Sequence, residues 1–86
     1  MDLYKVEVKK SAVKELQSLD TRFIPVIWKQ IKKLSENPTP MHSAKLWASD
    51  KSYRIRIGNY RVVYQVDDDR RIVTVQRIKH RREVYR

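Results

Sequence analysis

The stretch that decides the fold runs from Tyr53 to Tyr64 and reads YRIRIGNYRVVY. Apolar and basic residues alternate on both sides of Gly58-Asn59, which predicts two strands joined by a two-residue hairpin turn. We expect both turn residues to accept the positive φ angles that such turns need. The segment therefore predicts a β-hairpin with one polar and one apolar face.

The turn also fixes the register of this hairpin, because its length determines which residues face each other. Arg56 is predicted to pair with Arg61, and Arg54 with Val63. Cross-strand partners share a face of the sheet, so Arg54, Arg56 and Arg61 should lie together on one face. The opposite face is apolar and should meet the helices; it holds Tyr53, Ile55, Ile57, Tyr60, Val62 and Tyr64.

The facing arginines are unfavourable by themselves, since directly opposed like charges destabilise a hairpin by up to roughly 1 kcal/mol. The side chains could splay into water, which is the purely structural explanation. A phosphate placed between Arg56 and Arg61 would instead convert the repulsion into charge-assisted hydrogen bonds. We interpret the pair as a phosphate-binding feature.

Downstream of the hairpin, residues 67–70 (DDDR) predict a turn and Ile72 to Ile78 a last strand rich in β-branched residues. With Val66 opposite Arg71 across this turn, Arg61 would fall opposite Gln76. The chain then continues as a basic tail, residues 79–86 (KHRREVYR), which should leave the sheet at the end where Arg61 lies.

Upstream of the hairpin, Tyr4 to Val8 alternate as a half-buried strand. A helix is predicted from a Ser11 cap to about Leu19, and a second one follows a cap at Asp20 or Thr21. Pro25 is acceptable in the first turn of this second helix.

The second helix carries an apolar stripe of Ile24, Ile27, Ile31 and Leu34, with Phe23 and Trp28 beside it. We expect the stripe and the two aromatic residues to pack in the core. Residues 37–40 (NPTP) end the helix, and the short link predicts an antiparallel helix pair. A short strand from Ala44 to Trp47 should follow.

The resulting order is a strand, two helices and a four-strand meander, which predicts an α+β fold with the helices on one face of a mostly antiparallel sheet. The chain has 86 residues, which suits a single domain spanning 1–86. It has no cysteine, so neither a disulfide framework nor a Cys-based zinc site is expected. We expect no cofactor and no bound metal.

The overall charge also indicates the class of partner. The formal net charge is +10, and the sequence pI of about 10.2 exceeds the value of ~9 typical of nucleic-acid-binding domains. The sequence shows neither a signal peptide nor an apolar run of the roughly 20 residues that span a bilayer. We therefore expect a cytoplasmic protein with a polyanionic partner and no membrane association.

The hairpin, together with the ending His80-Arg81-Arg82-Glu83-Val84-Tyr85, resembles the RelE branch of the RelE/ParE toxin superfamily. The resemblance covers essentially the whole chain. The pattern Gly-x-Tyr-Arg-x-x-Tyr is common to much of the superfamily, whereas His-Arg-x-x-x-Tyr is more specific. The resemblance implies a type II toxin–antitoxin toxin that enters the ribosomal A site and cleaves mRNA there, a metal-independent endoribonuclease that inhibits translation.

The resemblance also implies roles for residues. Arg61 and Arg81 match the family's phosphate and transition-state arginines, and Tyr85 matches its substrate-orienting tyrosine. The remaining basic residues, Arg54, Arg56, Lys79 and Arg82, are expected to bind RNA, and Arg82 could take the role assigned to Arg81. Tyr85 among cations also fits the stacking and phosphate contacts by which proteins hold single-stranded RNA.

One departure from the family bears on the mechanism, because Arg54 and Arg56 stand where relatives often have lysines. An arginine effectively cannot lose its proton, so neither residue can act as a general base. His80, with an ordinary pKa near neutrality, is one candidate base. Tyr85 is another, if nearby arginines lower its pKa. His42 is interpreted as a surface residue.

Two other functions remain open from the sequence. A ParE-like toxin would have the same fold and would inhibit DNA gyrase by protein binding, without nuclease activity. A nucleic-acid-binding module without catalysis would need only the basic face. The partners that the resemblance implies are a cognate antitoxin, the ribosome with its mRNA, and operator DNA contacted through the antitoxin complex.

Overall fold

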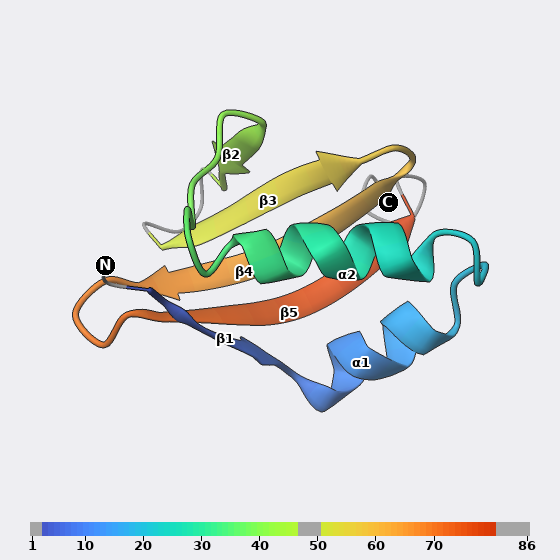
Figure 1. The fold of residues 1–86 in the computed structure, drawn as a ribbon, viewed down its shortest axis with the longest axis horizontal. Coiled ribbons are helices and arrows are strands. Elements are labelled where there is room, and N and C mark those ends of the chain that lie inside the picture. The colour runs from blue at the N-terminus through green and yellow to red at the C-terminus, as the bar shows by residue number, and fades with distance from the viewer. Residues whose placement is uncertain (1–2, 47–50, 81–86) are drawn as a thin grey trace.

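The computed structural model describes residues 3–46 and 51–80, which form two helices and five strands (Figure 1). In chain order the elements are β1 (Lys5–Val8), α1 (Lys10–Gln17), α2 (Ile24–Lys33), β2 (Ser43–Lys45), β3 (Ser52–Ile57), β4 (Tyr60–Asp67) and β5 (Ile72–His80). The strands form one sheet in the order β1-β5-β4-β3-β2. Only β1 and β5 run parallel, and the other pairs are antiparallel. The predicted α+β fold with a four-strand meander is therefore confirmed.

Both helices begin differently from the prediction. The N-cap of α1 is Lys9, two residues before the predicted Ser11, and no side chain caps it. The N-cap of α2 is Phe23, because the Asp20 carboxylate accepts the Arg22 N–H in a separate turn that precedes the helix. Pro25 lies in the first turn of α2, as expected. The chain reverses between the helices, and α2 runs back along the sheet (Figure 1).

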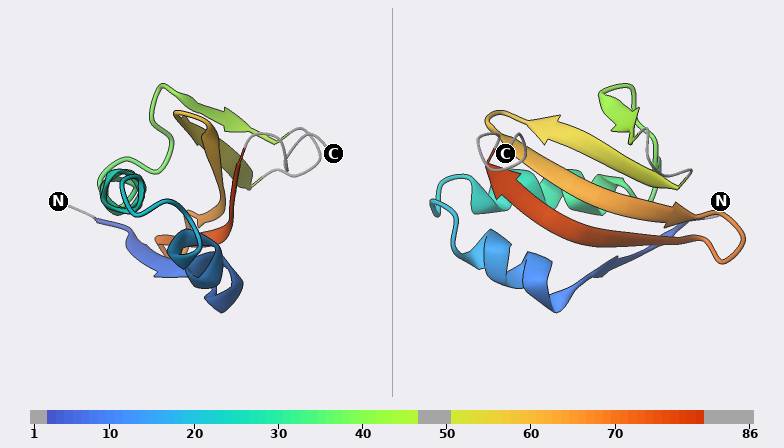
Figure 2. Two further views of the ribbon diagram at one scale, coloured as in Figure 1. Left: turned by 90° about the vertical axis from the view of Figure 1, so that its right-hand side faces the viewer. Right: turned by 180° about the vertical axis from the view of Figure 1, so that it is seen from behind.

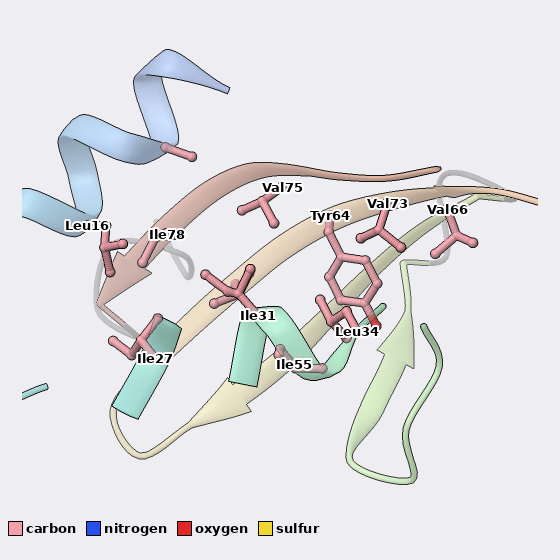
Figure 3. Close-up of a cluster of buried hydrophobic side chains, with 12 residues drawn as sticks. Leu16, Ile27, Ile31, Leu34, Ile55, Tyr64, Val66, Val73, Val75 and Ile78 are labelled. Atoms are coloured by element: carbon pink, nitrogen blue, oxygen red, sulfur yellow. The ribbon is translucent and has the colours of Figure 1, made fainter. Parts of the chain in front are cut away.

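The core lies between the two helices and one face of the sheet (Figure 3). Aliphatic side chains from α2 meet those of the central strands, and the buried set comprises Ala12, Leu16, Ile27, Ile31, Leu34, Ile55, Val62, Tyr64, Val66, Val73, Val75 and Ile78. The aromatic part of the prediction was wrong, since Phe23 and Trp28 are each 41% exposed. Phe23 packs at the rim of the core, with its ring 5.5 Å from that of Tyr60.

The β3–β4 hairpin has the predicted register, including Arg56 opposite Arg61 and Arg54 opposite Val63. The turn differs from the prediction in one respect. Gly58 has a positive φ of 59°, whereas the φ of Asn59 is not positive. A positive φ confined to the first central residue is typical of a type II′ turn. Asn59 therefore does not need the left-handed conformation that the sequence analysis assigned to it.

Replacing Gly58 with alanine should destabilise the protein by about 1–2 kcal/mol, because a Cβ makes this positive φ unfavourable. A Cβ built on Gly58 meets no atom within 4 Å, so the cost would come from the backbone alone. The midpoint of urea unfolding measures the effect. Asn59→Ala is the matched control and should shift the midpoint much less; equal shifts would contradict the turn assignment.

The β4–β5 pairing corrects the predicted register. Val66 faces Val73 rather than Arg71, and Arg61 faces Lys79 rather than Gln76. The difference arises partly from a longer turn and partly from an irregularity beside Val63 and Tyr64, where Gln76 is an extra residue on β5. Such a β-bulge reverses the alternation of side chains beyond it. It turns Ile78 into the core and sends its two neighbours, Arg77 and Lys79, to the opposite face.

Strand ends also differ from the predictions. β5 continues to His80, two residues beyond the predicted end, so Lys79 and His80 belong to the sheet rather than to a tail. β2 begins and ends earlier than predicted, at Ser43 and Lys45, and Trp47 lies outside the described residues. None of the helices in the described ranges has the length and apolar character needed to cross a lipid bilayer.

Tyr64 is fully buried in the core, and its hydroxyl donates a 2.7 Å hydrogen bond to the Pro38 carbonyl. Burial raises the pKa of Tyr64 to about 12; a hydrogen bond with Ser43 opposes this rise and the nearby Tyr53 adds to it. The hydrogen bond ties the middle of the α2–β2 connection to the centre of the sheet.

The raised pKa of Tyr64 predicts a loss of stability at high pH. The folded-state value of about 12 lies above the ordinary value of 10.0, so the neutral phenol is favoured by folding. This contribution is complete below pH ~10 and should disappear as the pH rises towards ~12. Urea unfolding of wild type and Tyr64→Phe should show a wild-type advantage that shrinks over this interval. A constant difference between the two proteins would contradict the shifted pKa.

Candidate nucleic-acid interface

Basic side chains gather on the sheet face turned away from the helices. Figure 2 (right) shows the ribbon from the side of this face. Arg56, Arg61 and Lys79 stand directly opposite one another across β3, β4 and β5. Arg54 and Arg77 lie one pair further along the strands, on either side of Val63. Because cross-strand partners share a face, these five residues form one surface, which we call the basic face.

The arginines of the basic face differ greatly in exposure. Arg56 is exposed and Arg54 is half-buried. Arg61 is only 1% exposed, and its Nε and Nη1 atoms are buried. The purely structural explanation, in which the arginine side chains extend into water, is therefore wrong for Arg61. A guanidinium stays protonated even when buried, so it places a fixed positive charge in the middle of the face.

A carboxylate approaches the basic face from α1. Glu15 Oε2 lies 2.6 Å from Lys79 Nζ and 3.2 Å from Arg77 Nε. Its Oε1 accepts a 2.9 Å hydrogen bond from the Ile78 amide. Burial alone would raise the pKa of Glu15, but the bonds from Lys79 and the Ile78 amide, with the Arg77 charge, hold it below its usual value. Glu15 therefore offsets part of the positive charge at the β5 edge.

The β3 side of the face keeps its positive charge. Among residues 3–46 and 51–80, no carboxylate lies within salt-bridge distance of Arg54 or Arg56. The acidic residues of the described sheet face, Glu7 and Asp67, lie towards its other end, beside the β4–β5 turn. The predicted clustering of Arg54, Arg56 and Arg61 on one face is thus present, and their β5 neighbours Arg77 and Lys79 are ion-paired with Glu15.

His80 does not join the arginines. It faces Tyr60 across the sheet, two residues after the core residue Ile78, so it lies on the helix-facing side. Its ring contacts that of Tyr60 edge-on, with the centroids 5.4 Å apart. The structure therefore separates His80 from Arg61 by the thickness of the sheet.

The C-terminal candidates Arg81, Arg82 and Tyr85 lie outside the described residues. The last residue of β5, His80, lies opposite Tyr60, the residue before Arg61, so the described part of the strand extends to the end of the sheet where Arg61 lies. His42 is exposed, as expected of a surface residue. No group of three His, Asp or Glu side chains in the described ranges is arranged to hold a metal ion.

Glu15 is the residue of this surface that the sequence analysis missed. It follows Lys14 on the first helix, and nothing in its surroundings along the sequence marks it as a partner of residues more than 60 positions away. The apolar spacing of α1 could only place it near the helix–sheet boundary. The bulge at Gln76, which brings Lys79 to the same face as Arg61, had no signal in the sequence either.

The sequence and the fold match a known family. The family model described as ParE toxin of type II toxin–antitoxin systems, parDE, matches residues 6–85. The chain therefore belongs to this toxin family, within the RelE/ParE superfamily.

Its relatives are of the RelE type. The chain is 34% identical to the proposed toxin RelE1 of Methanocaldococcus jannaschii, over 96% of each chain. It is 35% identical to a proposed RelE-like toxin protein of Escherichia coli, covering 95% of this chain and 90% of the relative.

Solved structures agree with these relatives. The RelE–RelB complex of Pyrococcus horikoshii aligns with a TM-score of 0.82 and 30% identity, covering 94% of this chain and 97% of that one. A mutant of the E. coli toxin RelE in its free state aligns with a TM-score of 0.80 and 28% identity, covering 96% and 90%. The predicted RelE-type fold is confirmed by these structures.

Proposed function

We propose that this toxin is a ribosome-dependent endoribonuclease that cleaves mRNA in the A site and so inhibits translation. The observation that supports the proposal is the row of Arg56, Arg61 and Lys79 across three strands, with Arg54 and Arg77 beside it. A polyanionic strand lying across this face would relieve the repulsion between its cations. A target of this kind places the protein in the cytoplasm.

The proposed reaction is attack of a ribose 2′-oxygen on the adjacent phosphorus atom. The bond from phosphorus to the 5′-oxygen breaks, which leaves a 2′,3′-cyclic phosphate and a 5′-hydroxyl. A base takes the proton of the 2′-hydroxyl, and an acid returns one to the 5′-oxygen. Because the RNA supplies its own nucleophile, the proposal includes neither a metal nor a cofactor.

Arg61 is proposed to stabilise the charge that develops on the phosphorane-like transition state. A buried guanidinium is held in place before the substrate arrives, and its charge acts more strongly where water is excluded. Arg54 and Arg56 are proposed to clamp flanking phosphates. By motif position, Arg81 joins Arg61 at the transition state, with Arg82 as the alternative.

The general base is proposed to be Tyr85 rather than His80. Arginines cannot accept the proton, and His80 lies against Tyr60 on the far side of the sheet from Arg61. Tyr85, five residues after His80, is the other candidate base, because neighbouring arginines would lower the pKa of its hydroxyl. His80 is assigned to packing at the end of β5.

We also propose a cognate antitoxin as partner. The Pyrococcus horikoshii relative was solved as a complex of RelE with RelB, and a Mycobacterium tuberculosis relative as a toxin–antitoxin complex. A chain with a net charge of +10 would be matched by an acidic or amphipathic segment that wraps around it. Operator DNA would be contacted through the antitoxin rather than by this chain alone.

Translating ribosomes carrying a defined mRNA test the proposed function. Toxin freed of antitoxin should produce cuts at A-site codons, and the 3′ ends of the upstream fragments should carry a cyclic phosphate. The same mRNA without ribosomes should remain largely intact. Intact mRNA together with inhibited DNA gyrase would overturn the nuclease proposal in favour of ParE-type action.

A further inference from the structure

The end of β5 extends past β1, the strand that lies beside it on one side of the described sheet. The parallel pairing of β1 with β5 stops at Val8 opposite Val75, and the Lys9 amide makes a last bond to the Val75 carbonyl. From Gln76 to His80, β5 therefore has no β1 residue beside it. A strand edge of this kind presents backbone amides that must find other partners.

Glu15 occupies the position that a continued β1 would fill. Its Oε1 accepts the Ile78 amide at 2.9 Å, as a backbone carbonyl of a neighbouring strand would. Its Oε2 holds Lys79 Nζ at 2.6 Å and Arg77 Nε at 3.2 Å. One carboxylate thus contacts three consecutive residues, 77–79, from both the backbone and the side chains.

The anchored residues border the proposed active centre. Lys79 is the cross-strand partner of Arg61, and Ile78 faces Val62 in the core. The Glu15 side chain is only 17% exposed, which strengthens its ion pairs relative to those on the open surface. The lowered pKa of Glu15 keeps the carboxylate charged at neutral pH.

We propose that Glu15 is a positioning residue, which fixes the end of β5 and holds Lys79 against the row that contains Arg61. This role rests on the proposed nuclease function. It would let Glu15, a residue of α1, affect catalysis without contacting the RNA. The positive charges of Arg77 and Lys79 are both paired with the single carboxylate of Glu15.

The test compares Glu15→Ala, Glu15→Gln and Glu15→Asp with wild type. Alanine removes the bonds altogether, and aspartate keeps the charge but is too short by one carbon to reach Ile78 in the same way. Glutamine keeps an oxygen that can accept the Ile78 amide. Glu36→Ala is the matched control, because it removes a carboxylate from an exposed site in the connection that follows α2.

The first readout is amide hydrogen exchange in ¹⁵N-labelled protein, with Val62 as the internal reference. Exchange at Ile78 should accelerate about tenfold or more in Glu15→Ala and Glu15→Asp, and little in Glu15→Gln or Glu36→Ala. Unchanged exchange at Ile78 in both the alanine and the aspartate variant would overturn the proposal. Because the aspartate variant keeps the charge, the test does not depend on the alanine variant folding.

The second readout is cleavage on programmed ribosomes, with kcat and KM determined separately. Glu15→Ala should lower kcat by about ten- to a hundredfold, since misplacement by about 1 Å can cost that much. KM should not rise, because the variant gains net positive charge. Glu15→Gln should recover most of the rate. A normal kcat despite fast Ile78 exchange would overturn the catalytic part of the proposal. If the wild-type protein cuts no RNA, the proposed function is overturned. The exchange result would then decide by itself whether Glu15 anchors the end of β5.

Discussion

Replacing Arg61 with alanine should lower the rate of ribosome-dependent cleavage by about 10²–10³-fold, the usual loss when a single transition-state donor is removed. The residue is 1% exposed in the middle of the basic face, opposite Arg56 on one side and Lys79 on the other. Its charge therefore acts where solvent screening is weakest. Cleavage should be measured at saturating ribosome concentration, so that the loss appears in kcat.

Because Arg61 is buried, its removal also leaves a space, and the variant could lose stability as well as activity. Arg61→Met fills most of that volume without a charge and should show a similar loss of kcat in a protein with normal unfolding. Arg61→Lys keeps a charge but loses the planar fork of donors, so we expect an intermediate rate. Arg22→Ala, at an exposed site before α2, is the matched control and should cleave at the wild-type rate.

A methionine variant that cleaves at the wild-type rate would remove Arg61 from the mechanism. It would also leave the basic face as a binding surface alone, in line with a nucleic-acid-binding module.

The largest expected effect on stability comes from Ile31→Ala in α2. Ile31 is 0% exposed and points from the helix into the core between Ile27, Leu34 and the sheet (Figure 3). Truncating a fully buried isoleucine typically costs about 2–5 kcal/mol, from lost burial and the cavity that remains. This is a large share of the roughly 5–15 kcal/mol by which small domains are stable.

Urea unfolding measured by circular dichroism checks this expectation. Val26→Ala is the matched control, since Val26 is on the same helix but 49% exposed, and alanine has the higher helix propensity. Its effect should stay within about 0.5 kcal/mol. If the two variants unfold at the same urea concentration, α2 does not pack on the sheet by this face.

The parts of the fold governed by short-range rules could be predicted from the sequence. The β3–β4 register follows from a two-residue turn and alternating side chains, and the predicted pairs Arg56–Arg61 and Arg54–Val63 are present. The apolar spacing of α2 likewise identified Ile27, Ile31 and Leu34 as core residues. Local geometry decides these features, so the local sequence contains the information.

Features that depend on tertiary contacts could not be predicted in the same way. The extra residue at Gln76 changes the face of every later β5 side chain, and the pattern from Ile72 to Ile78 gives no sign of it. The Glu15 contacts join residues 62 to 64 positions apart. The burial of Arg61 also runs against the usual exposure of arginine. The sequence therefore predicted that Arg54, Arg56 and Arg61 share a face. It did not predict the burial or the ion pairs of the individual charged side chains.

The parallel pairing of β1 with β5 has a consequence for how the chain folds. Lys5 to Val8 have no strand partner until Ile72 to Val75 have been synthesised, so almost the whole sequence must exist before the first strand is placed. Contacts between the two ends of a chain close a large loop and slow folding. During synthesis the antiparallel strands can assemble as a hairpin meander, while the N-terminal edge of the sheet closes last.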